Sequence, residues 1–186
     1  MDAFRHLSSS RDSVVNIPDH PAAGVYAIFA KSAECLPAVV LPSSGLVYIG
    51  LSSDLEQRNH FKAKHSGFHS PRRSIGAILK TELNLTATPR APGASETNYK
   101  NFRFSDDGEE CLTRWMQLNL EYSIYPFDGN VDQLETRLIR ENEPPLNLTK
   151  WRNPQKQKIQ ALRNVCKEEA KIIWRKRNKL QVLSRY

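Results

Sequence analysis

The sequence has few cysteines and no long apolar run. Its three cysteines, Cys35, Cys111 and Cys166, lie far apart and form no CxxC pair, which argues against a disulfide framework and against a cysteine-rich zinc site. No stretch is apolar over the length that crossing a bilayer requires, and the N-terminal residues lack the apolar centre of a signal peptide. We therefore expect a protein of a reducing, cytoplasmic compartment with no membrane partner.

Acidic residues are scarce at the C-terminal end of the chain. Residues 150–186 hold 12 Lys and Arg against two acids, whereas residues 1–149 hold 15 Lys and Arg against 18 acids. A strongly basic segment favours a polyanionic partner, because its cations release counterions from phosphates. A solvated helix face would have the same composition, so charge alone leaves both interpretations open.

The hydrophobic pattern predicts short strands that alternate with helices. Residues 24–30 (GVYAIFA) and 46–50 (LVYIG) are rich in β-branched and aromatic residues, and the turn-like segment between them indicates a hairpin. The remaining elements are predicted from periodicity and capping residues, with strands at residues 101–105 and 120–127 and helices at residues 54–64, 72–83, 107–117, 132–142 and 154–180.

These elements predict an α+β fold with a small, mostly antiparallel sheet flanked by helices. The chain length suits one domain with an extension better than two domains. We expect the domain at residues 1–149, with an insertion near residues 85–105, and a basic helical extension at residues 150–186. An amphipathic pattern in the extension suggests that its apolar stripe packs on the domain.

Four short motifs occur in a defined order along the predicted elements. GVY at residues 24–26 and YIG at residues 48–50 lie on the two strands of the expected hairpin. Arg58 follows on the next helix, and Glu135 lies on a helix that leads into Pro-Pro-Leu-Asn, which ends at Asn147. This order resembles the signature of the GIY-YIG nuclease superfamily, in particular its small stand-alone bacterial members. The resemblance covers roughly residues 21–149.

The resemblance implies a metal-dependent endonuclease and a role for each residue. Tyr26 would act as general base or orient the attacking water, and Tyr48 would bind the phosphate or shape the pocket. Arg58 would offer its planar guanidinium to the scissile phosphate. Glu135 would hold one Mg²⁺ or Mn²⁺ ion, because one carboxylate with waters and phosphate oxygens suits a hard divalent cation. Each residue also has a structural alternative, as a half-buried strand aromatic or an exposed helix side chain.

The sequence departs from the family pattern at one position. Family members commonly carry His or Tyr one helical turn after the arginine, where this chain has Lys62. His60 lies two residues after Arg58 and does not share its helix face, whereas His65 lies seven residues after it and can. Helix geometry favours Lys62 or His65, while an alignment on the HF dipeptide favours His60, so all three stay candidates.

Several further residues are predicted to contact substrate. Asn147 closes the Pro-Pro-Leu-Asn motif, although a turn asparagine can equally satisfy local backbone. The basic helix would follow DNA phosphates without reading sequence. The predicted substrate-binding residues are Asn147, Arg72, Arg73, Lys156 and Lys158.

The leading functional hypothesis is an endonuclease that cuts DNA in restriction, defence or repair. Its expected partner is double-stranded DNA, and a homodimer is one route to cutting both strands. The departure at Lys62 motivates an alternative, a catalytically inactive nucleic-acid-binding module on the same fold. A third hypothesis is an α+β protein whose basic tail binds an acidic partner protein.

Overall fold

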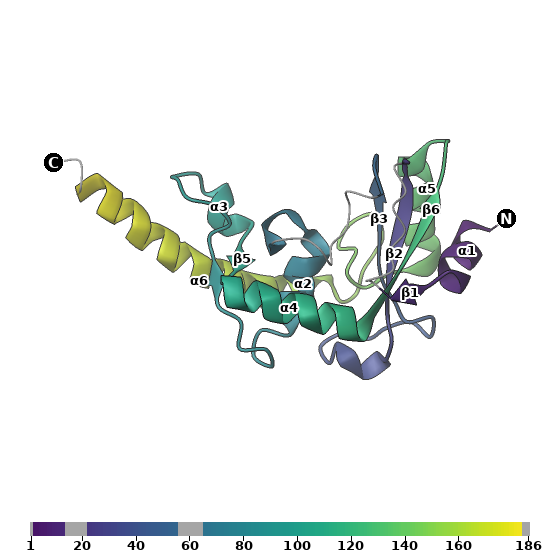
Figure 1. Ribbon diagram of the computed structural model, residues 1–186, viewed down its shortest axis with the longest axis horizontal. Coiled ribbons are helices and arrows are strands. Elements are labelled where there is room, and N and C mark those ends of the chain that lie inside the picture. Colours follow the sequence, from purple (N-terminus) through teal and green to yellow (C-terminus); the bar gives the residue numbers. More distant parts are fainter. Residues whose placement is uncertain (1, 14–21, 56–64, 184–186) are drawn as a thin grey trace. The chain divides into compact units, whose positions relative to one another are not determined.

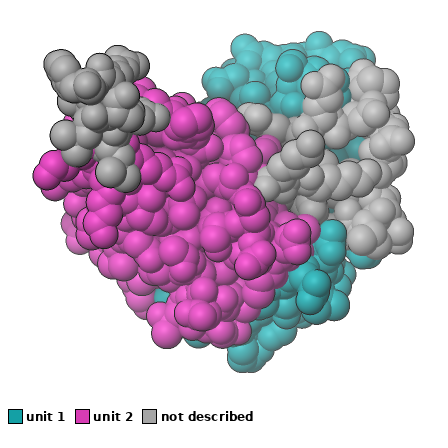
Figure 2. Space-filling model, turned by 60° about the vertical axis from the view of Figure 1, so that its left-hand side comes forward, with its two compact units in different colours: residues 1–62, 114–156 teal, residues 63–113, 157–186 magenta. Residues whose placement is uncertain are grey.

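The computed structural model of the protein describes residues 2–13, 22–55 and 65–183 (Figure 1). The chain divides into two compact units, coloured separately in Figure 2. Unit 1 comprises Met1–Lys62 and Arg114–Lys156, and unit 2 comprises Ala63–Thr113 and Gln157–Tyr186. The predicted α+β class is confirmed, with a small antiparallel sheet and a long C-terminal helix. Within the described ranges, no helix has the length and apolarity that a membrane span requires.

Unit 1 is built on a four-stranded antiparallel sheet in the order β1-β6-β2-β3 (Figure 1). Its strands are β1 (Asp12–Ser13), β2 (Gly24–Ala30), β3 (Leu46–Ser52) and β6 (Leu120–Pro126). The predicted hairpin is confirmed, because β2 and β3 pair with Tyr26 opposite Gly50 and Ile28 opposite Tyr48. The central strand β2 is buried along its whole length, as its continuous apolar sequence requires.

One face of this sheet carries the hydrophobic core of unit 1. Helices α1 (Ala3–Ser9) and α5 (Val131–Asn142) belong to this unit, together with the 3₁₀ turn η2 (Ala33–Cys35). The core joins side chains from α1 and α5, alternate positions of β2, and two positions of β3 on either side of a register shift in the hairpin. Its members are Ala3, Leu7, Val25, Ala27, Phe29, Leu46, Ile49, Leu134, Leu138 and Ile139. Because strand side chains alternate between faces, Tyr26 and Tyr48 project from the opposite face.

Unit 2 is mostly helical. Its elements are η3 (Ser66–Phe68), α2 (Ser70–Ile78), α3 (Thr97–Lys100), the two-stranded sheet of β4 (Ala87–Thr88) and β5 (Arg103–Phe104), the first part of α4 (Asp106–Asn119) and nearly all of α6 (Lys156–Leu183). Glu109 is buried and accepts hydrogen bonds from Ser66 N (2.7 Å) and Phe104 N (2.9 Å). It therefore ties η3 and β5 to α4.

Most predicted elements are present within a few residues of their expected limits. The predicted helix at residues 72–83 is shorter, as α2 ends at Ile78 and is followed by turns that include Asn84 at a φ of 49°. The strand predicted at residues 101–105 is only the two residues of β5. Helix α1 was not predicted, because seven residues are too few to display a helical period. Most of the helix predicted at residues 54–64 lies outside the described residues.

Candidate active site

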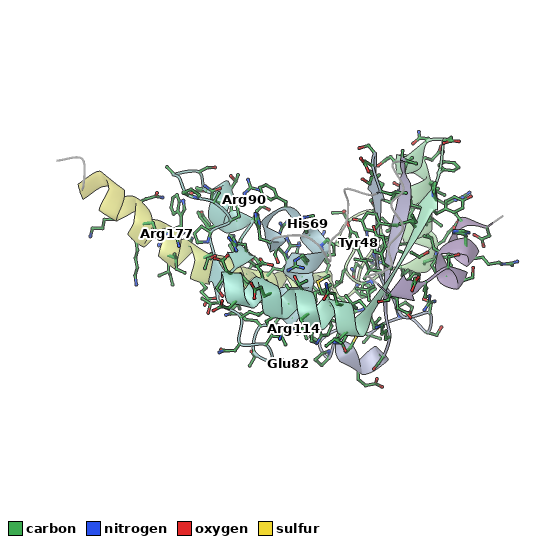
Figure 3. The ribbon with its side chains drawn as sticks, in the orientation of Figure 1. Tyr48, His69, Glu82, Arg90, Arg114 and Arg177 are labelled. Carbon is green, nitrogen blue, oxygen red and sulfur yellow. The ribbon has the colours of Figure 1, made fainter. Side chains whose placement is uncertain are left out.

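Tyr26 and Tyr48 lie side by side on the face of the sheet that is turned away from the core. Their ring centroids are 6.1 Å apart and the rings are inclined by 38°. Tyr122 of β6 stacks on the other side of Tyr26, with centroids 5.4 Å apart. Tyr26 is only 2% exposed, whereas Tyr48 is partly exposed and is labelled in Figure 3. The two phenols therefore converge, as their strand positions predict.

Gly50 leaves the space that the ring of Tyr26 fills. A Cβ at Gly50 would lie 2.4 Å from Tyr26 Oη, 2.5 Å from Tyr26 Cζ and 2.8 Å from Tyr48 Cε1. These separations are far below van der Waals contact, so any side chain at this position would displace the rings. The glycine that ends the YIG tripeptide thus sets the position of the tyrosine in the GVY tripeptide.

Asn147 clamps the edge of the sheet beside Tyr48. Its Oδ1 accepts a hydrogen bond from Ile49 N (2.9 Å), and its Nδ2 donates to Ile49 O (2.7 Å). Strand β3 is at the edge of the sheet, where backbone groups have no neighbouring strand. Leu146 N donates to Val47 O (3.1 Å) in the same way. The Pro-Pro-Leu-Asn segment therefore supports the strand that carries Tyr48, and Asn147 holds the backbone of a distant strand and not only that of its own turn.

Glu135 is a nearly buried carboxylate, 7% exposed, on the helix α5. Its Oε2 contacts the ammonium of Lys150, which also pairs with Asp132 Oδ1 at 2.8 Å. Asp132 precedes Glu135 by three residues, so the two carboxylates lie one above the other on the helix. Burial alone would lower the pKa of Lys150, but its hydrogen bonds to Asp132 and Glu135 outweigh burial and raise the pKa. Lys150 therefore stays a cation at neutral pH.

Neither Lys150 nor Asp132 was predicted from the sequence as a site residue. Lys150 has a left-handed backbone, with a φ of 73°, which is uncommon for a residue with a side chain. The bridge joins positions 15 residues apart in the sequence. The only sequence signal for this bridge is that Lys150 comes shortly after the Pro-Pro-Leu-Asn motif. No periodic pattern relates Lys150 to the helix α5, which carries its two partners.

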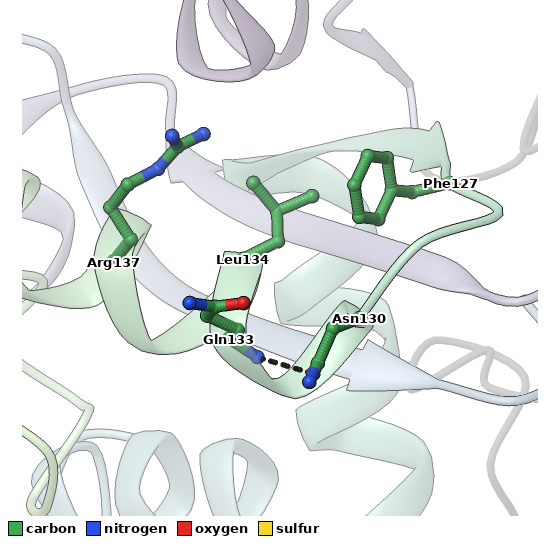
Figure 4. Close-up of a pocket in the computed structure, with 5 residues that line it drawn as sticks. All are labelled: Phe127, Asn130, Gln133, Leu134 and Arg137. Atoms are coloured by element: carbon green, nitrogen blue, oxygen red, sulfur yellow. Dashed lines mark hydrogen bonds between the residues drawn. The ribbon is translucent and has the colours of Figure 1, made fainter.

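Two hollows open along the helix that carries Glu135. One, of about 720 Å³, is lined by Asp132 together with polar and basic residues of α5, among them Arg137 and Arg140. The other, of about 240 Å³, lies at the start of the helix, where Asn130 Oδ1 accepts a hydrogen bond from Gln133 N (Figure 4). Asp132 thus connects the Lys150 bridge to a hollow at the surface of unit 1.

The carboxylates around Lys150 form a small donor set for a metal. In the described parts of the chain, no three His, Cys, Asp or Glu side chains gather into one cluster. Glu135 and Asp132 offer only oxygen donors, which are the ligands that Mg²⁺ prefers. The residues fit a hard divalent cation, since the Lys150 ammonium already demonstrates that positive charge is accommodated between these carboxylates.

Four further residues were predicted as candidates for catalysis. Arg58, His60 and Lys62 fall outside the described residues. His65 belongs to unit 2 and caps η3, with Nδ1 accepting a hydrogen bond from Gly67 N (3.3 Å). Burial, followed by the charge of Arg103, lowers the pKa of His65. The imidazole of His65 is therefore mainly neutral at pH 7.

The residues that were predicted to contact substrate differ in burial and in their partners. Arg72 is fully buried in unit 2, and its Nη2 pairs with Glu109 Oε2 at 2.7 Å. The guanidinium of Arg72 thus neutralises an interior carboxylate, and its contact with substrate stays a prediction. Arg73 is also nearly buried but has no carboxylate partner among the described residues. Lys156 and Lys158 begin α6, partly exposed and exposed respectively.

Comparison with known protein families identifies the family of the chain. The profile of one family, described as the GIY-YIG catalytic domain, matches residues 24–169. The match begins at the GVY tripeptide and includes Glu135, Asn147 and the first half of α6. No curated protein and no solved structure matched the chain. Because the family profile covers most of its length, the chain belongs to the GIY-YIG catalytic domain family.

Proposed function

We propose that the protein is a metal-dependent endonuclease that hydrolyses phosphodiester bonds in DNA. The family to which the chain belongs consists of nucleases, which act on nucleic acid and are generally metal-dependent. The observation that carries the proposal is that Tyr26 and Tyr48, from the two signature tripeptides of this family member, lie side by side around Gly50. A second support is the nearly buried carboxylate of Glu135 in the same unit.

Glu135 is the residue that would hold the metal, with Asp132 beside it. A bound divalent cation supplies charge neutralisation at the phosphate and a lower pKa for bound water. Mg²⁺ or Mn²⁺ suits the oxygen donors, and one ion suits one nearly buried carboxylate. Lys150 would have to yield its contact with Glu135 to an entering cation, because both occupy the same carboxylate oxygen.

The tyrosines would orient the attacking water and the phosphate. A phenol has an ordinary pKa of about 10, so Tyr26 needs nearby positive charge to act as a base at neutral pH. Its ring is held between Gly50 and Tyr122, which fixes the phenol oxygen before substrate arrives. Arg58 would contact the scissile phosphate, and Lys62, His60 or His65 would fill the position where the family has His or Tyr.

The basic C-terminal helix would add contacts to the DNA backbone. Residues 150–186 carry 12 Lys and Arg against two acids, and Lys156 and Lys158 begin the helix. Such contacts position a duplex without reading its sequence. We propose double-stranded DNA as the substrate. The enzyme would cut it in the cytoplasm, in restriction, defence or repair. A homodimer would allow both strands to be cut.

Plasmid nicking tests the proposal. Purified protein with Mg²⁺ or Mn²⁺ should convert supercoiled plasmid to the open circular form, and Glu135→Gln should abolish the conversion. Glu143→Gln is the matched control, since this exposed residue ends the same helix and should leave nicking unchanged. Nicking that persists in Glu135→Gln would contradict the role of this carboxylate.

An inactive nucleic-acid-binding module is the second candidate function. The lysine at position 62, where the family has His or Tyr, favours it. This alternative predicts a shift of DNA in an electrophoretic mobility assay, with no cleavage under any tested divalent metal. Nicking by the wild-type protein that depends on Glu135 would exclude it.

A further inference from the structure

Three arginines of unit 2 gather on one short segment, the turn at residues 66–70. Arg73 Nη1 donates hydrogen bonds to the carbonyl oxygens of Ser66 (3.1 Å) and Gly67 (2.8 Å). Arg163 Nη1 donates to Ser70 Oγ at 3.4 Å. All of these groups belong to unit 2, so the cluster is complete within one compact unit.

Arg90 packs on the same turn. A Cβ at Gly67 would lie 2.6 Å from the Cβ of Arg90, so the arginine rests directly on this glycine. The guanidinium carbon of Arg90 lies 4.8 Å from the ring centroid of Phe68, and the residue is labelled in Figure 3. Arg90 and Arg163 are both partly exposed, which leaves them within reach of a ligand.

No acid in the described parts of the chain pairs with the arginines of this cluster. Two other arginines of the unit have acidic partners, since Arg72 pairs with Glu109 and Arg103 with Asp106. Among the described residues, no ion pair joins an acid to Arg73, Arg90 or Arg163.

Burial and repulsion from the neighbouring arginines both lower the pKa of Arg73. Burial, and then the charges of Arg163 and Arg90, lower the pKa of Arg73 to about 10, and no acid acts against them. Arg73 is 8% exposed, and its Nε is buried without a hydrogen-bond partner in the described structure. A buried cation without a counter-ion is unfavourable, so an anion bound here would stabilise the fold.

The chemistry of the cluster selects phosphate as the anion. Guanidinium groups present paired donors that match phosphate oxygens. Helix α2 begins at Ser70, inside the turn, and its first turn contains no acidic residue. A helix N-terminus adds partial positive charge that favours an anion.

We propose that Arg73, Arg90, Arg163 and the turn at residues 66–70 form a phosphate-binding site. The site would hold a backbone phosphate of the nucleic acid, and it belongs to unit 2, whereas the tyrosines and Glu135 belong to unit 1. The source of the phosphate rests on the proposed nuclease function, whereas the site itself rests on unit 2 alone. Its role is to anchor the substrate, with no part in bond cleavage.

Binding of inorganic pyrophosphate to the full chain tests the site. Titration calorimetry in a metal-free chloride buffer should detect binding, and pyrophosphate should raise the melting temperature, because a ligand that binds only the folded state stabilises it. The double variant Arg90→Gln with Arg163→Gln should bind at least about tenfold more weakly, as expected for loss of charge-assisted hydrogen bonds. Without pyrophosphate its melting temperature should be equal to or above that of the wild type, because repulsion with Arg73 is removed.

The matched control is Arg175→Gln with Arg177→Gln, which removes the same charge from exposed positions of α6. It should retain pyrophosphate binding within about threefold, since surface charges separated by more than a Debye length are screened. Equal weakening in both double variants, or no binding by the wild type, would overturn the site. A lower melting temperature of the first double variant without pyrophosphate, with binding unchanged, would assign these arginines a purely structural role.

A duplex DNA without terminal phosphates connects the site to nucleic acid. It should displace bound pyrophosphate from the wild type, and failure to do so would contradict the assignment to a backbone phosphate. Plasmid nicking tests the nuclease proposal independently of pyrophosphate binding, which tests the phosphate site. A protein that binds pyrophosphate but nicks no DNA would contradict the nuclease proposal, whereas a nuclease that binds no pyrophosphate would contradict this site alone.

Discussion

Substitution of Gly50 by alanine tests how the two tyrosines are positioned. The added Cβ would lie 2.4 Å from Tyr26 Oη and 2.5 Å from its Cζ. Tyr26 is 2% exposed and stacked on Tyr122, so its ring cannot turn away without disturbing the sheet. Overpacking of this kind costs about 1–3 kcal/mol in the free energy of unfolding. We expect urea unfolding to report a loss in this range.

The effect of Gly50→Ala on activity should exceed its effect on folding. A shift of a catalytic group by roughly 1 Å can reduce a rate by about a hundredfold. We expect plasmid nicking per folded molecule to fall by that order. Gly76→Ala is the control, because its Cβ would lie 2.2 Å from Phe104 Cε2 in the interior of unit 2. It should lower stability without reducing the nicking rate of the folded protein.

A second substitution separates the two effects of Gly50→Ala. Tyr26→Phe removes the oxygen that the new Cβ would meet, so it should recover part of the lost stability. The two substitutions should therefore be non-additive, as expected for residues in contact. Nicking should stay low in the double variant, because the phenol is absent. Wild-type nicking by Gly50→Ala would refute the proposed positioning of Tyr26.

Three further outcomes follow from the described contacts. Glu109→Ala should lower the free energy of unfolding by about 3–5 kcal/mol, because it removes the carboxylate that pairs with the buried guanidinium of Arg72. Glu110→Ala, at an exposed position, should change it by less than about 0.5 kcal/mol. Lys150→Met should tighten Mn²⁺ binding several-fold in a titration followed by electron paramagnetic resonance, because it removes the ammonium that bridges Asp132 and Glu135. Weaker binding would contradict competition between this ammonium and the metal for the two carboxylates. Burial raises the pKa of the Cys166 thiol to about 12, so a thiol reagent at pH 8 should label the exposed Cys111 first and Cys166 only after unfolding, and equal labelling rates would contradict this burial.

The sheet of unit 1 was predictable because its strands carry local signals. GVYAIFA and LVYIG are apolar and rich in β-branched and aromatic residues, and the turn-like segment between them indicates their antiparallel pairing. Helix α5 was predictable for a similar reason, since Asn130 caps it and Pro144 follows its end. These features depend on neighbours in the sequence and need no knowledge of tertiary contacts.

The partners of the key side chains were not predictable, because they come from distant positions. Asn147 contacts Ile49 from 98 residues away, and Arg72 finds Glu109 from 37 residues away. A sequence motif identifies an arginine or an asparagine without indicating whether its polar group faces substrate or protein interior. The same limit explains why Lys150 was missed beside Glu135, since its approach depends on a left-handed backbone at that residue.

A crystal structure of the protein soaked in Mn²⁺ tests the central claim most directly. Anomalous scattering should locate one Mn²⁺ ion bonded to a carboxylate oxygen of Glu135, at roughly 2.0–2.2 Å, a distance typical of small hard divalent cations. The ammonium of Lys150 should have left that oxygen. A soaked crystal in which Lys150 keeps its contact with Glu135, with no anomalous peak beside the carboxylate, would contradict the claim that Glu135 binds the catalytic metal.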